Sequence, residues 1–362
     1  MAPVVLELQR RHEIEPIICV TAQHRDMLDE ALRVFNILPH HDLDIMRPDQ
    51  TPAGITSMVI DKLVPLLAAL KPAVVLVHGD TTTSFAAALA SFYQGIPVGH
   101  VEAGLRTGNL AAPWPEEFNR RSVDLTADLL WAPTPSAAAN LRKEGAKSDR
   151  IILSGNTVID ALCIAKDMIE GDAALRDRIW QRLPRVDSRR RLILVTGHRR
   201  ESFKSGLANV CRALRRLAER SDVEIIWPLH PNPQVRVTVE RELRPADNVH
   251  LIAPIDYLGF VALMMRSHLI ISDSGGIQEE APTLLKPVLV TRDETERPEA
   301  IAAGTAVLVG TSAKRIHATA THLLDDASAY ARMAGLPNPF GDGRAAVRIV
   351  DSLIARYGGK TS

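Results

Sequence analysis

Three carboxylate side chains in the first half of the sequence are candidates for acid–base chemistry: Asp80, Glu102 and Glu116. Asp80 follows the apolar run VVLV by two residues, and Glu102 directly follows PVGHV. Because parallel strands end at a common edge of a sheet, such acids can meet there, and crowding can raise the pKa of one above the others. A set of this kind suits proton removal from carbon. The same spacing also fits acids that cap helices or pair with Arg106 and Arg120.

A second candidate site is an anion-binding turn. The segment LIISDSGGIQEE ends an apolar run and passes through Ser274, Gly275 and Gly276 into a predicted helix that carries Glu280. Free N–H groups and the positive end of the helix dipole favour an anion at such a turn. Glycines, which lack a Cβ, allow a diphosphate to approach closely. Glu280 lies one turn further on, where it can accept hydrogen bonds from ribose hydroxyls. A plain glycine turn at a helix start is the alternative interpretation.

Histidines and arginines add further candidates. The segment LVTGHRRESF places His198 and Arg199 just after a predicted strand. His198 can contact a phosphate or act as an acid, or it can be an ordinary loop histidine. Arg297 can supply positive charge for a nucleotide. His78 and His100 lie nearer the buried strands, and we interpret them as structural. Neither GxGxxG nor GxxxxGK[ST] follows a predicted strand, so the sequence supports neither a tightly bound NAD nor a P-loop.

The elements that position these residues follow from the hydrophobic pattern. Several apolar runs (VVLV, LILV, LIIS, VLV) are continuous, which is typical of parallel strands buried on both faces. Between them, apolar residues recur at helical spacing and predict a helix over 53–70. This alternation predicts a doubly wound α/β fold. The predicted strands are Pro16–Thr21, Ala73–His78, Pro97–Val101, Leu129–Ala132, Ile151–Leu153, Leu192–Thr196, Glu224–Pro228, Val249–Ile252, Leu269–Ser272, Val288–Thr291 and Ala306–Val309.

The length of the chain predicts two domains, since 362 residues are too many for one ordinary core. The segment Asn156–Arg191 is helical in pattern and rich in charge, and we expect the crossover between the domains there. We predict an N-terminal Rossmann-like domain over 1–158 with the carboxylates and a second Rossmann-like domain over 159–343. A C-terminal helix over 344–362 is expected to pack back on the first domain.

The composition limits the class of protein. Lys plus Arg and Asp plus Glu both number 43, so no net charge favours nucleic acid or a membrane surface. The three scattered cysteines fit a reducing compartment and indicate neither a zinc site nor a disulfide framework. No apolar run is expected to approach the roughly 18–20 residues that span a bilayer. The N-terminus is too short and too quickly charged for a secretory signal. We therefore expect a cytoplasmic protein.

At this point the motifs coincide with those of a known family. The sequence resembles the non-hydrolysing UDP-N-acetylglucosamine 2-epimerases of bacteria, from MAPVVLEL to the C-terminal helix. The resemblance implies a glycosyltransferase-B-like pair of Rossmann-like domains that face a cleft, with UDP held by the second domain. The matching segments are VTAQHRDMLDE, VVLVHGDTTTSFAAALASFYQGIPVGHVEAGLRTG, PWPEEFNRR, GNTVIDAL, LVTGHRRESF, ISDSGGIQEEAP and RDETERPEA.

The resemblance also implies a reaction. Without metal or NAD, UDP leaves carbon 1 as the proton at carbon 2 is removed, and UDP then adds back to the resulting glycal with the opposite configuration at carbon 2. The product, UDP-N-acetylmannosamine, is a precursor of cell-surface polysaccharides, and the enzymes are usually homodimers. By position, the catalytic residues would be Asp80, Glu102, Glu116 and His198. The UDP-binding residues would be His198, Arg199, Phe260 (near the uracil), Ser274, Gly275, Gly276, Glu280 (at the ribose) and Arg297.

One departure from the family pattern concerns the N-terminus. Family members begin with a β-strand and a glycine turn, whereas MAPVV should already belong to the first helix. A missing central strand would leave backbone groups of its neighbours unpaired, and we expect that the given start lies inside a longer product or that activity is impaired. Two alternatives to the epimerase are a UDP-sugar glycosyltransferase of the same fold, which would not need all three acids, and a non-catalytic UDP-sugar-binding protein.

Overall fold

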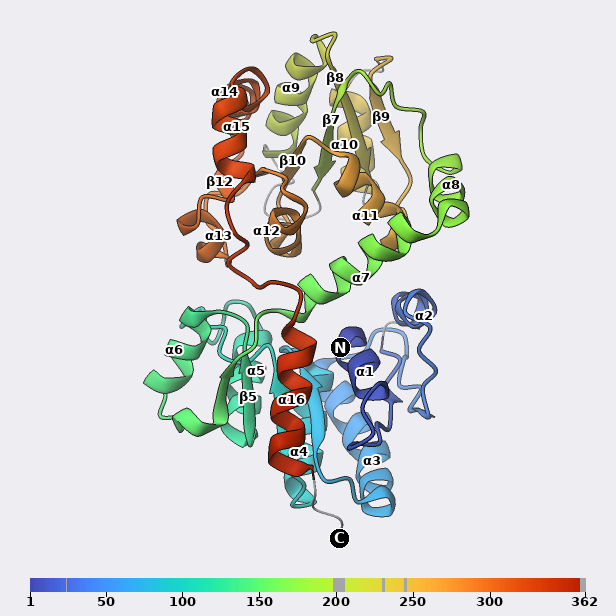
Figure 1. Cartoon of the computed structure of the whole chain (residues 1–362), viewed down its shortest axis with the longest axis vertical. Coiled ribbons are helices and arrows are strands. Elements are labelled where there is room, and N and C mark those ends of the chain that lie inside the picture. Colours follow the sequence, from blue (N-terminus) through green and yellow to red (C-terminus); the bar gives the residue numbers. More distant parts are fainter. Residues whose placement is uncertain (24, 198–205, 230–231, 244–245, 359–362) are drawn as a thin grey trace. The chain divides into compact units, whose positions relative to one another are not determined.

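The computed structural model describes residues 1–23, 25–197, 206–229, 232–243 and 246–358 (Figure 1). The chain forms two compact units. Unit 1 comprises Met1–Ala161 and Phe340–Ser362, and unit 2 comprises Leu162–Pro339. Helix α7 (Thr157–Gly171) crosses the boundary between them.

Unit 1 contains a small and a larger parallel sheet. The strands β3, β4, β5 and β6 pair in that order, and β1 pairs with β2 separately. Because all four strands of the larger sheet are parallel, Asp80 and Glu102 follow adjacent strand ends at one edge. The elements are α1 (Ala2–Gln9), β1 (Cys19–Val20), α2 (Arg25–Val34), β2 (His41–Asp42), α3 (Pro52–Leu70), β3 (Val75–His78), α4 (Thr82–Tyr93), β4 (Val98–Val101), α5 (Glu116–Thr126), β5 (Leu129–Ala132), α6 (Pro135–Lys143), β6 (Ile151–Leu153) and α16 (Ala345–Tyr357).

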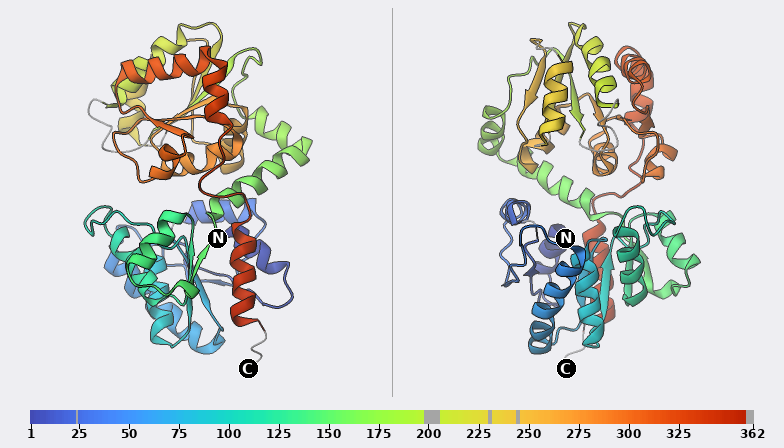
Figure 2. Two further views of the ribbon diagram at one scale, coloured as in Figure 1. Left: turned by 60° about the vertical axis from the view of Figure 1, so that its left-hand side comes forward. Right: turned by 180° about the vertical axis from the view of Figure 1, so that it is seen from behind.

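Alternating side chains of β5 divide the core of unit 1 into two layers. Leu129 and Trp131 face α1 and α16, whereas Leu130 packs toward α4, α5 and α6. The indole N–H of Trp131, a fully buried residue, donates a 2.8 Å hydrogen bond to Ser352 of α16. The C-terminal helix is therefore built into the core of the N-terminal unit, where it lies beside α1 (Figures 1 and 2).

Helix α3 corrects one expectation from the sequence. It has 19 residues with a mean hydropathy of 1.6 over its apolar window, so the expectation that no segment approaches membrane-spanning length is wrong. In unit 1 this helix packs through Ile55, Val59 and Leu63 onto the core between α3 and α4. Length and composition are weak evidence for a membrane span, because the helices of folded cores pass the same test.

Unit 2 is a doubly wound sheet of six parallel strands in the order β9-β8-β7-β10-β11-β12. In sequence order this is the 3-2-1-4-5-6 arrangement of a Rossmann fold, whose ligands bind where the order reverses, here between β7 and β10. The elements are α8 (Ala173–Gln181), β7 (Arg191–Thr196), α9 (Gly206–Ala218), β8 (Val223–Pro228), α10 (Pro233–Glu242), β9 (Val249–Ile252), α11 (Tyr257–Arg266), β10 (Leu269–Ser272), α12 (Gly275–Glu280), β11 (Val288–Val290), α13 (Pro298–Ala302), β12 (Ala306–Leu308), α14 (Ala313–Asp325) and α15 (Ala327–Ala334).

The central strands of unit 2 are buried on both faces. One face packs on α9, α10, α14 and α15 through side chains such as Ile193, Ile225 and Ile271. The intervening residues, including Leu194 and Ile270, are also fully buried. This burial explains the continuous apolar runs of the sequence.

The predicted strands and helices agree with the structure to within a few residues. All eleven predicted strands are present, and the helix predicted over 53–70 is α3. The sequence missed β2, because His41–Asp42 has only two residues and neither is apolar. The α/β fold class is confirmed, and α1 begins at Ala2, as expected for a chain that starts in a helix.

Candidate active site

Asp80 lies in the turn between β3 and α4. Gly79 takes a left-handed conformation (φ +66°) and Thr81 caps α4 by accepting a 3.2 Å hydrogen bond from the N–H of Ser84. The Asp80 carboxylate forms an ion pair with Arg120 of α5, and the backbone oxygen of Asp80 accepts 2.9 Å from the side-chain amide of Asn119. The pairing with Arg120 that the sequence offered as an alternative is therefore present, and it fixes Asp80 at the strand edge.

Glu102 lies in the neighbouring turn, after β4. Its backbone has φ +71°, a left-handed conformation that costs a non-glycine residue on the order of 1 kcal/mol and is typical of functional sites. Asn156 donates a 3.2 Å hydrogen bond to Glu102 Oε1, and His78 Nε2 lies 3.9 Å from Oε2. The Cα of Gly79 is also adjacent, since a Cβ there would be 3.0 Å from Oε2. Glu102 and Asp80 are thus brought to one edge of the sheet.

His78, which was interpreted from the sequence as structural, lies close to the Glu102 carboxylate. Its Nε2 is buried and has no hydrogen-bond partner within the described residues. Burial lowers the pKa of His78 well below its ordinary value, and the Met1 amino group and His100 lower it further. Its imidazole is therefore neutral at neutral pH and faces Glu102.

Glu116 and its neighbour Glu117 occupy the start of α5. Glu116 is half-buried and lies one helical turn before Arg120, on the face that reaches Asp80. Glu117 is fully buried and accepts hydrogen bonds from the backbone N–H groups of Thr107 (3.0 Å) and Gly108 (3.2 Å). Sequence reasoning missed this structural role of Glu117. Two adjacent acids at a helix start point in different directions, and only the three-dimensional structure separates them.

Beneath the two turns is a buried ionic network that sequence reasoning also missed. Asp124 of α5 contacts His100 (2.6 Å) and Arg106 (2.7 Å), and Arg106 continues to Glu144 (2.6 Å). Arg106 therefore pairs with Asp124 and Glu144, and not with the candidate acids. Although burial raises the pKa of Asp124, His100 and Arg106 lower it below its ordinary value.

In unit 2 the Ser-Gly-Gly turn follows β10 at the point where the strand order reverses. Thr196 of β7 and Ser272 of β10 are joined across that point by a 2.6 Å hydrogen bond between their hydroxyls. Ser274 precedes α12, and the guanidinium of Arg297 lies close to Gly275, whose added Cβ would be 3.8 Å from Arg297 Cζ. An arginine beside backbone N–H groups is an arrangement that attracts phosphate oxygens.

Glu280 is buried at the end of α12, and its pKa is raised to about 8, first by burial and then by the neighbouring carboxylate of Glu279. The nearby Tyr257 hydroxyl opposes this shift of the Glu280 pKa. Glu279 itself pairs with Arg297. Glu280 is therefore the acid of this turn that is not engaged by Arg297 and can serve a ligand hydroxyl.

Two predicted site residues and one aromatic remain to be placed. His198 and Arg199 lie outside the described residues. Phe260 is half-buried in the first turns of α11, the helix that also carries Tyr257. No group of three or more His, Cys, Asp or Glu side chains suited to a metal occurs among the residues that the structure describes.

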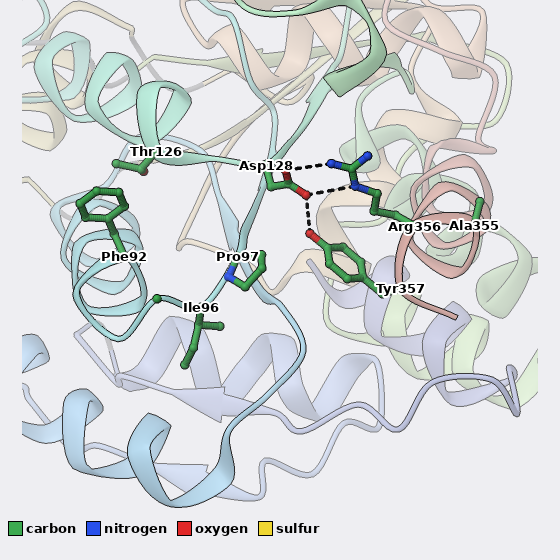
Figure 3. A pocket seen from close by; sticks show the side chains of 9 residues that line it. Phe92, Ile96, Pro97, Thr126, Asp128, Ala355, Arg356 and Tyr357 are labelled. Carbon is green, nitrogen blue, oxygen red and sulfur yellow. Dashed lines mark hydrogen bonds and ion pairs between the residues drawn. The ribbon is translucent and has the colours of Figure 1, made fainter. Parts of the chain in front are cut away.

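A surface pocket of about 680 Å³ lies elsewhere in unit 1 (Figure 3). Its lining includes Pro97 and Asp128, which precede β4 and β5, so it opens at the amino ends of these strands. The Asp128 carboxylate contacts Arg356 (3.1 Å) and accepts a 2.6 Å hydrogen bond from Tyr357. Since the candidate acids follow the carboxyl ends of the strands, this pocket is separate from them, and its polar contacts fix the end of α16.

Fold and site together define a two-unit α/β protein with acids at one strand edge and an anion-accepting turn at a Rossmann switch point. A family model described as UDP-N-acetylglucosamine 2-epimerase matches residues 6–354. The chain is 51% identical to the UDP-N-acetylglucosamine 2-epimerase of Yersinia pestis, over 98% of this chain and 94% of that protein. The chain belongs to the UDP-N-acetylglucosamine 2-epimerase family, which confirms the resemblance seen in the sequence.

Solved structures give the same result. A UDP-GlcNAc 2-epimerase from Neisseria meningitidis bound to UDP-GlcNAc matches with a TM-score of 0.90 and 48% identity, over 98% of this chain and 96% of that one. An alpha,alpha-trehalose-phosphate synthase (UDP-forming) from Burkholderia vietnamiensis matches with a TM-score of 0.55 at 15% identity, over 87% of this chain and 81% of that one. The second likeness shows the fold alone, and the predicted glycosyltransferase-B-like fold class is confirmed.

Proposed function

We propose that this chain interconverts UDP-N-acetylglucosamine and UDP-N-acetylmannosamine by inverting the configuration at carbon 2 of the sugar. The observation that carries the proposal is the 48% identity, across 98% of the chain, to a relative whose solved structure holds UDP-GlcNAc. The two halves of the site suit this substrate. Unit 1 supplies carboxylates for a proton at carbon, and unit 2 supplies an arginine and a glycine turn for a diphosphate.

The proposed reaction is an elimination followed by an addition. A base takes the proton from carbon 2, the C–H electron pair forms the C1–C2 double bond, and the C1–O bond breaks to release UDP. UDP oxygen then attacks carbon 1 while carbon 2 is protonated on its other face. Because the electrons leave with UDP and return with it, the reaction needs no redox cofactor.

In this proposal the proton is handled by Asp80, Glu102 and Glu116, with His198 at the departing diphosphate oxygen. Asp80 is held by Arg120 and Glu102 by Asn156. These contacts support the assignment, because a general base acts only from a fixed position. The residues proposed to hold UDP are His198, Arg199, Phe260, Ser274, Gly275, Gly276, Glu280 and Arg297.

The experiment that tests the proposal is proton NMR of the protein with UDP-N-acetylglucosamine in heavy water. We expect UDP-N-acetylmannosamine to appear with deuterium at carbon 2, because the abstracted proton exchanges with solvent before it returns. Product without deuterium would contradict proton exchange at carbon 2. The absence of any new sugar nucleotide, in protein shown to bind UDP, would overturn the activity itself.

We further propose that two copies of the chain form a homodimer through the outer face of α4 and α5. Apolar side chains gather there although they are exposed: Phe92 is 58% exposed and Leu125 is 83% exposed. Phe85 of α4 and Phe118 of α5 pack edge to face across this face, with ring centroids 5.6 Å apart. Exposed apolar and aromatic side chains on neighbouring helices favour a protein partner.

Sedimentation velocity tests the dimer. We expect the wild-type chain to sediment as a dimer and Leu125→Lys to sediment as a monomer, because a buried lysine ammonium would lose its hydration in the interface. Leu38→Lys is the matched control, since Leu38 is equally exposed (81%) but lies in another part of unit 1. A dimer in the Leu125 variant would place the interface elsewhere, and a wild-type monomer would overturn the dimer.

The cytoplasm is the compartment that we propose for the protein. No disulfide joins Cys19, Cys163 or Cys211 in the described part of the chain, and Cys211 is fully buried. Burial raises the pKa values of Cys19 (to about 11) and Cys211 (to about 12), which keeps both thiols protonated and unreactive. Such cysteines fit a reducing compartment.

A further inference from the structure

His100 is a fully buried histidine whose two ring nitrogens both meet oxygen acceptors. Its Nδ1 lies 2.6 Å from Asp124 Oδ1, and its Nε2 lies 2.9 Å from the carbonyl oxygen of Gly79. A carbonyl oxygen can only accept a hydrogen bond, so Nε2 carries a proton. The remaining question is whether the proton in the short contact belongs to Nδ1 or to Asp124.

The surroundings of Asp124 answer this question. Its other oxygen, Oδ2, accepts from the Arg106 guanidinium at 2.7 Å and from the backbone N–H of Gly104 at 3.2 Å. Two donors, one of which is a cation, stabilise a charged carboxylate more than a neutral acid. With Asp124 ionised, the proton lies on Nδ1, and His100 has two ring protons and a positive charge.

We propose that His100 is a doubly protonated positioning residue, which joins the turns that carry Asp80 and Glu102 by donating one hydrogen bond to the Gly79 carbonyl and one to Asp124. This inference rests on the proposed function, because it assigns His100 a role in the same proton transfer. The sequence indicated a structural role for His100 but not its partner, because Asp124 lies 24 residues further along the chain.

The contacts explain how one ring can fix both turns. Gly79 directly precedes Asp80, and its Cα is the surface on which the Glu102 carboxylate rests. Asp124 in turn fixes Gly104, two residues after Glu102, through the N–H of Gly104. Loss of the imidazolium therefore removes the hydrogen bond that holds Gly79 beside Glu102. It also removes a contact of Asp124, which holds Gly104 in the turn that carries Glu102.

The charged groups around His100 come from several elements. His78 of β3 lies on the opposite face of the sheet, because Val77 and not His78 is the register partner of His100, and burial lowers the pKa of His78 well below its ordinary value. Asp124 lies in α5. Arg106 lies in the segment after β4 and forms ion pairs with Asp124 and with Glu144, the C-cap residue of α6. The ionised set His100, Asp124, Arg106 and Glu144 has two positive and two negative charges. Paired charges of this kind can be retained at a buried site.

The first experiment measures the ring protons directly. In ¹⁵N NMR of the wild-type protein at neutral pH, both ring nitrogens of His100 should show the shifts of a protonated imidazole, because both lie against oxygen acceptors. His100→Gln assigns the resonances by their loss. A ring with one bare nitrogen at neutral pH would overturn the inference, and this result does not depend on any activity.

The second experiment measures epimerisation by deuterium exchange at carbon 2. His100→Gln should lower kcat about 10- to 100-fold and leave KM for UDP-N-acetylglucosamine within about 3-fold, because it displaces carboxylates without touching the nucleotide turn. His250→Gln is the matched control, since His250 forms a similar 2.7 Å contact with Glu224 in unit 2 and should keep wild-type kcat.

The outcomes separate this inference from the proposed function. Wild-type exchange with an unchanged kcat in His100→Gln would overturn the positioning role of His100. If His100→Gln does not fold, Asp124→Asn serves instead. It should convert His100 to a neutral ring in the ¹⁵N spectrum and lower kcat in the same way, and a retained imidazolium there would contradict the pairing. No exchange in the wild type would refute the epimerase, while the wild-type ring spectrum would still test the protonation of His100.

Discussion

Gly276→Ala should stabilise the fold and weaken the binding of UDP, two effects of opposite sign at a single carbon. Gly276 is the second residue of α12 and has no positive φ, so its backbone suits alanine. The nearest described side-chain or backbone atom to an added Cβ is Ser274 Oγ, at 3.9 Å. Neither backbone conformation nor packing within the described residues explains the glycine, and the proposed UDP site makes close approach of a ligand the explanation to test.

The magnitudes follow from these contacts. Alanine in place of an unstrained glycine stabilises a fold by about 0.4–1 kcal/mol, largely because the unfolded chain loses freedom. A methyl group between the turn and a phosphate prevents at least one charged hydrogen bond, and such bonds contribute about 1.5–3 kcal/mol. The dissociation constant for UDP should therefore rise about 10- to 150-fold.

Isothermal titration with UDP and urea unfolding measure the two effects on the same samples. Gly171→Ala is the matched control, because Gly171 ends α7 with no described atom within 4 Å of an added Cβ and should gain stability with no change in UDP affinity. Unchanged UDP affinity in Gly276→Ala would refute the ligand explanation for the glycine. A loss of stability would show backbone strain or crowding at Gly276 that the contacts described above do not reveal.

Three further predictions concern stability and rate. Glu280 has a folded-state pKa of about 8 against an ordinary 4.5, so between these pH values the folded protein binds one proton more than the unfolded chain. The free energy of unfolding should therefore fall as pH rises through that window, by about 1.4 kcal/mol for each pH unit. Glu280→Gln should flatten this slope in urea unfolding, and equal slopes would contradict it. The Asp160 carboxylate accepts hydrogen bonds from the first two N–H groups of α16, at 3.1 and 2.8 Å. Asp160→Ala should lower the free energy of unfolding by about 1–2 kcal/mol, as measured by urea unfolding. Asn156→Ala should lower kcat about 10-fold or more by releasing Glu102, and a changed KM alone in steady-state assays would contradict that role.

The sequence predicted the sheets well because their signal is local. The run LIIS is buried on every residue in β10, and a short continuous apolar run between polar turns is typical of a parallel strand buried on both faces. The Ser274 turn could likewise be predicted, because a strand, two glycines and a helix start are adjacent in the chain. The strand β2 gave no such signal, since His41 and Asp42 are polar and its pairing with β1 is all that defines it.

The partners of the acids could not be predicted, because their contacts join residues far apart in the chain. Arg120 reaches Asp80 across 40 residues and Asn156 reaches Glu102 across 54. No periodicity records which of several arginines pairs with which acid. For this reason the sequence left the pairing with Arg106 and Arg120 open, and the structure selects only Arg120.

The proposed function assigns proton transfer to unit 1 and UDP binding to unit 2, and this assignment can be measured. In unit 1 the acids Asp80 and Glu102 contact Arg120 and Asn156, whereas all the predicted UDP-binding residues belong to unit 2. Under the proposed function, Arg297 and the glycines of unit 2 hold a diphosphate that is present before and after the proton moves. Substitutions in unit 1 should therefore act mainly on kcat, which reports the transition state, whereas those at the glycine turn should act mainly on KM and on UDP affinity. A variant at Arg120 that raised only KM would show that the acid cluster binds substrate and does not handle its proton.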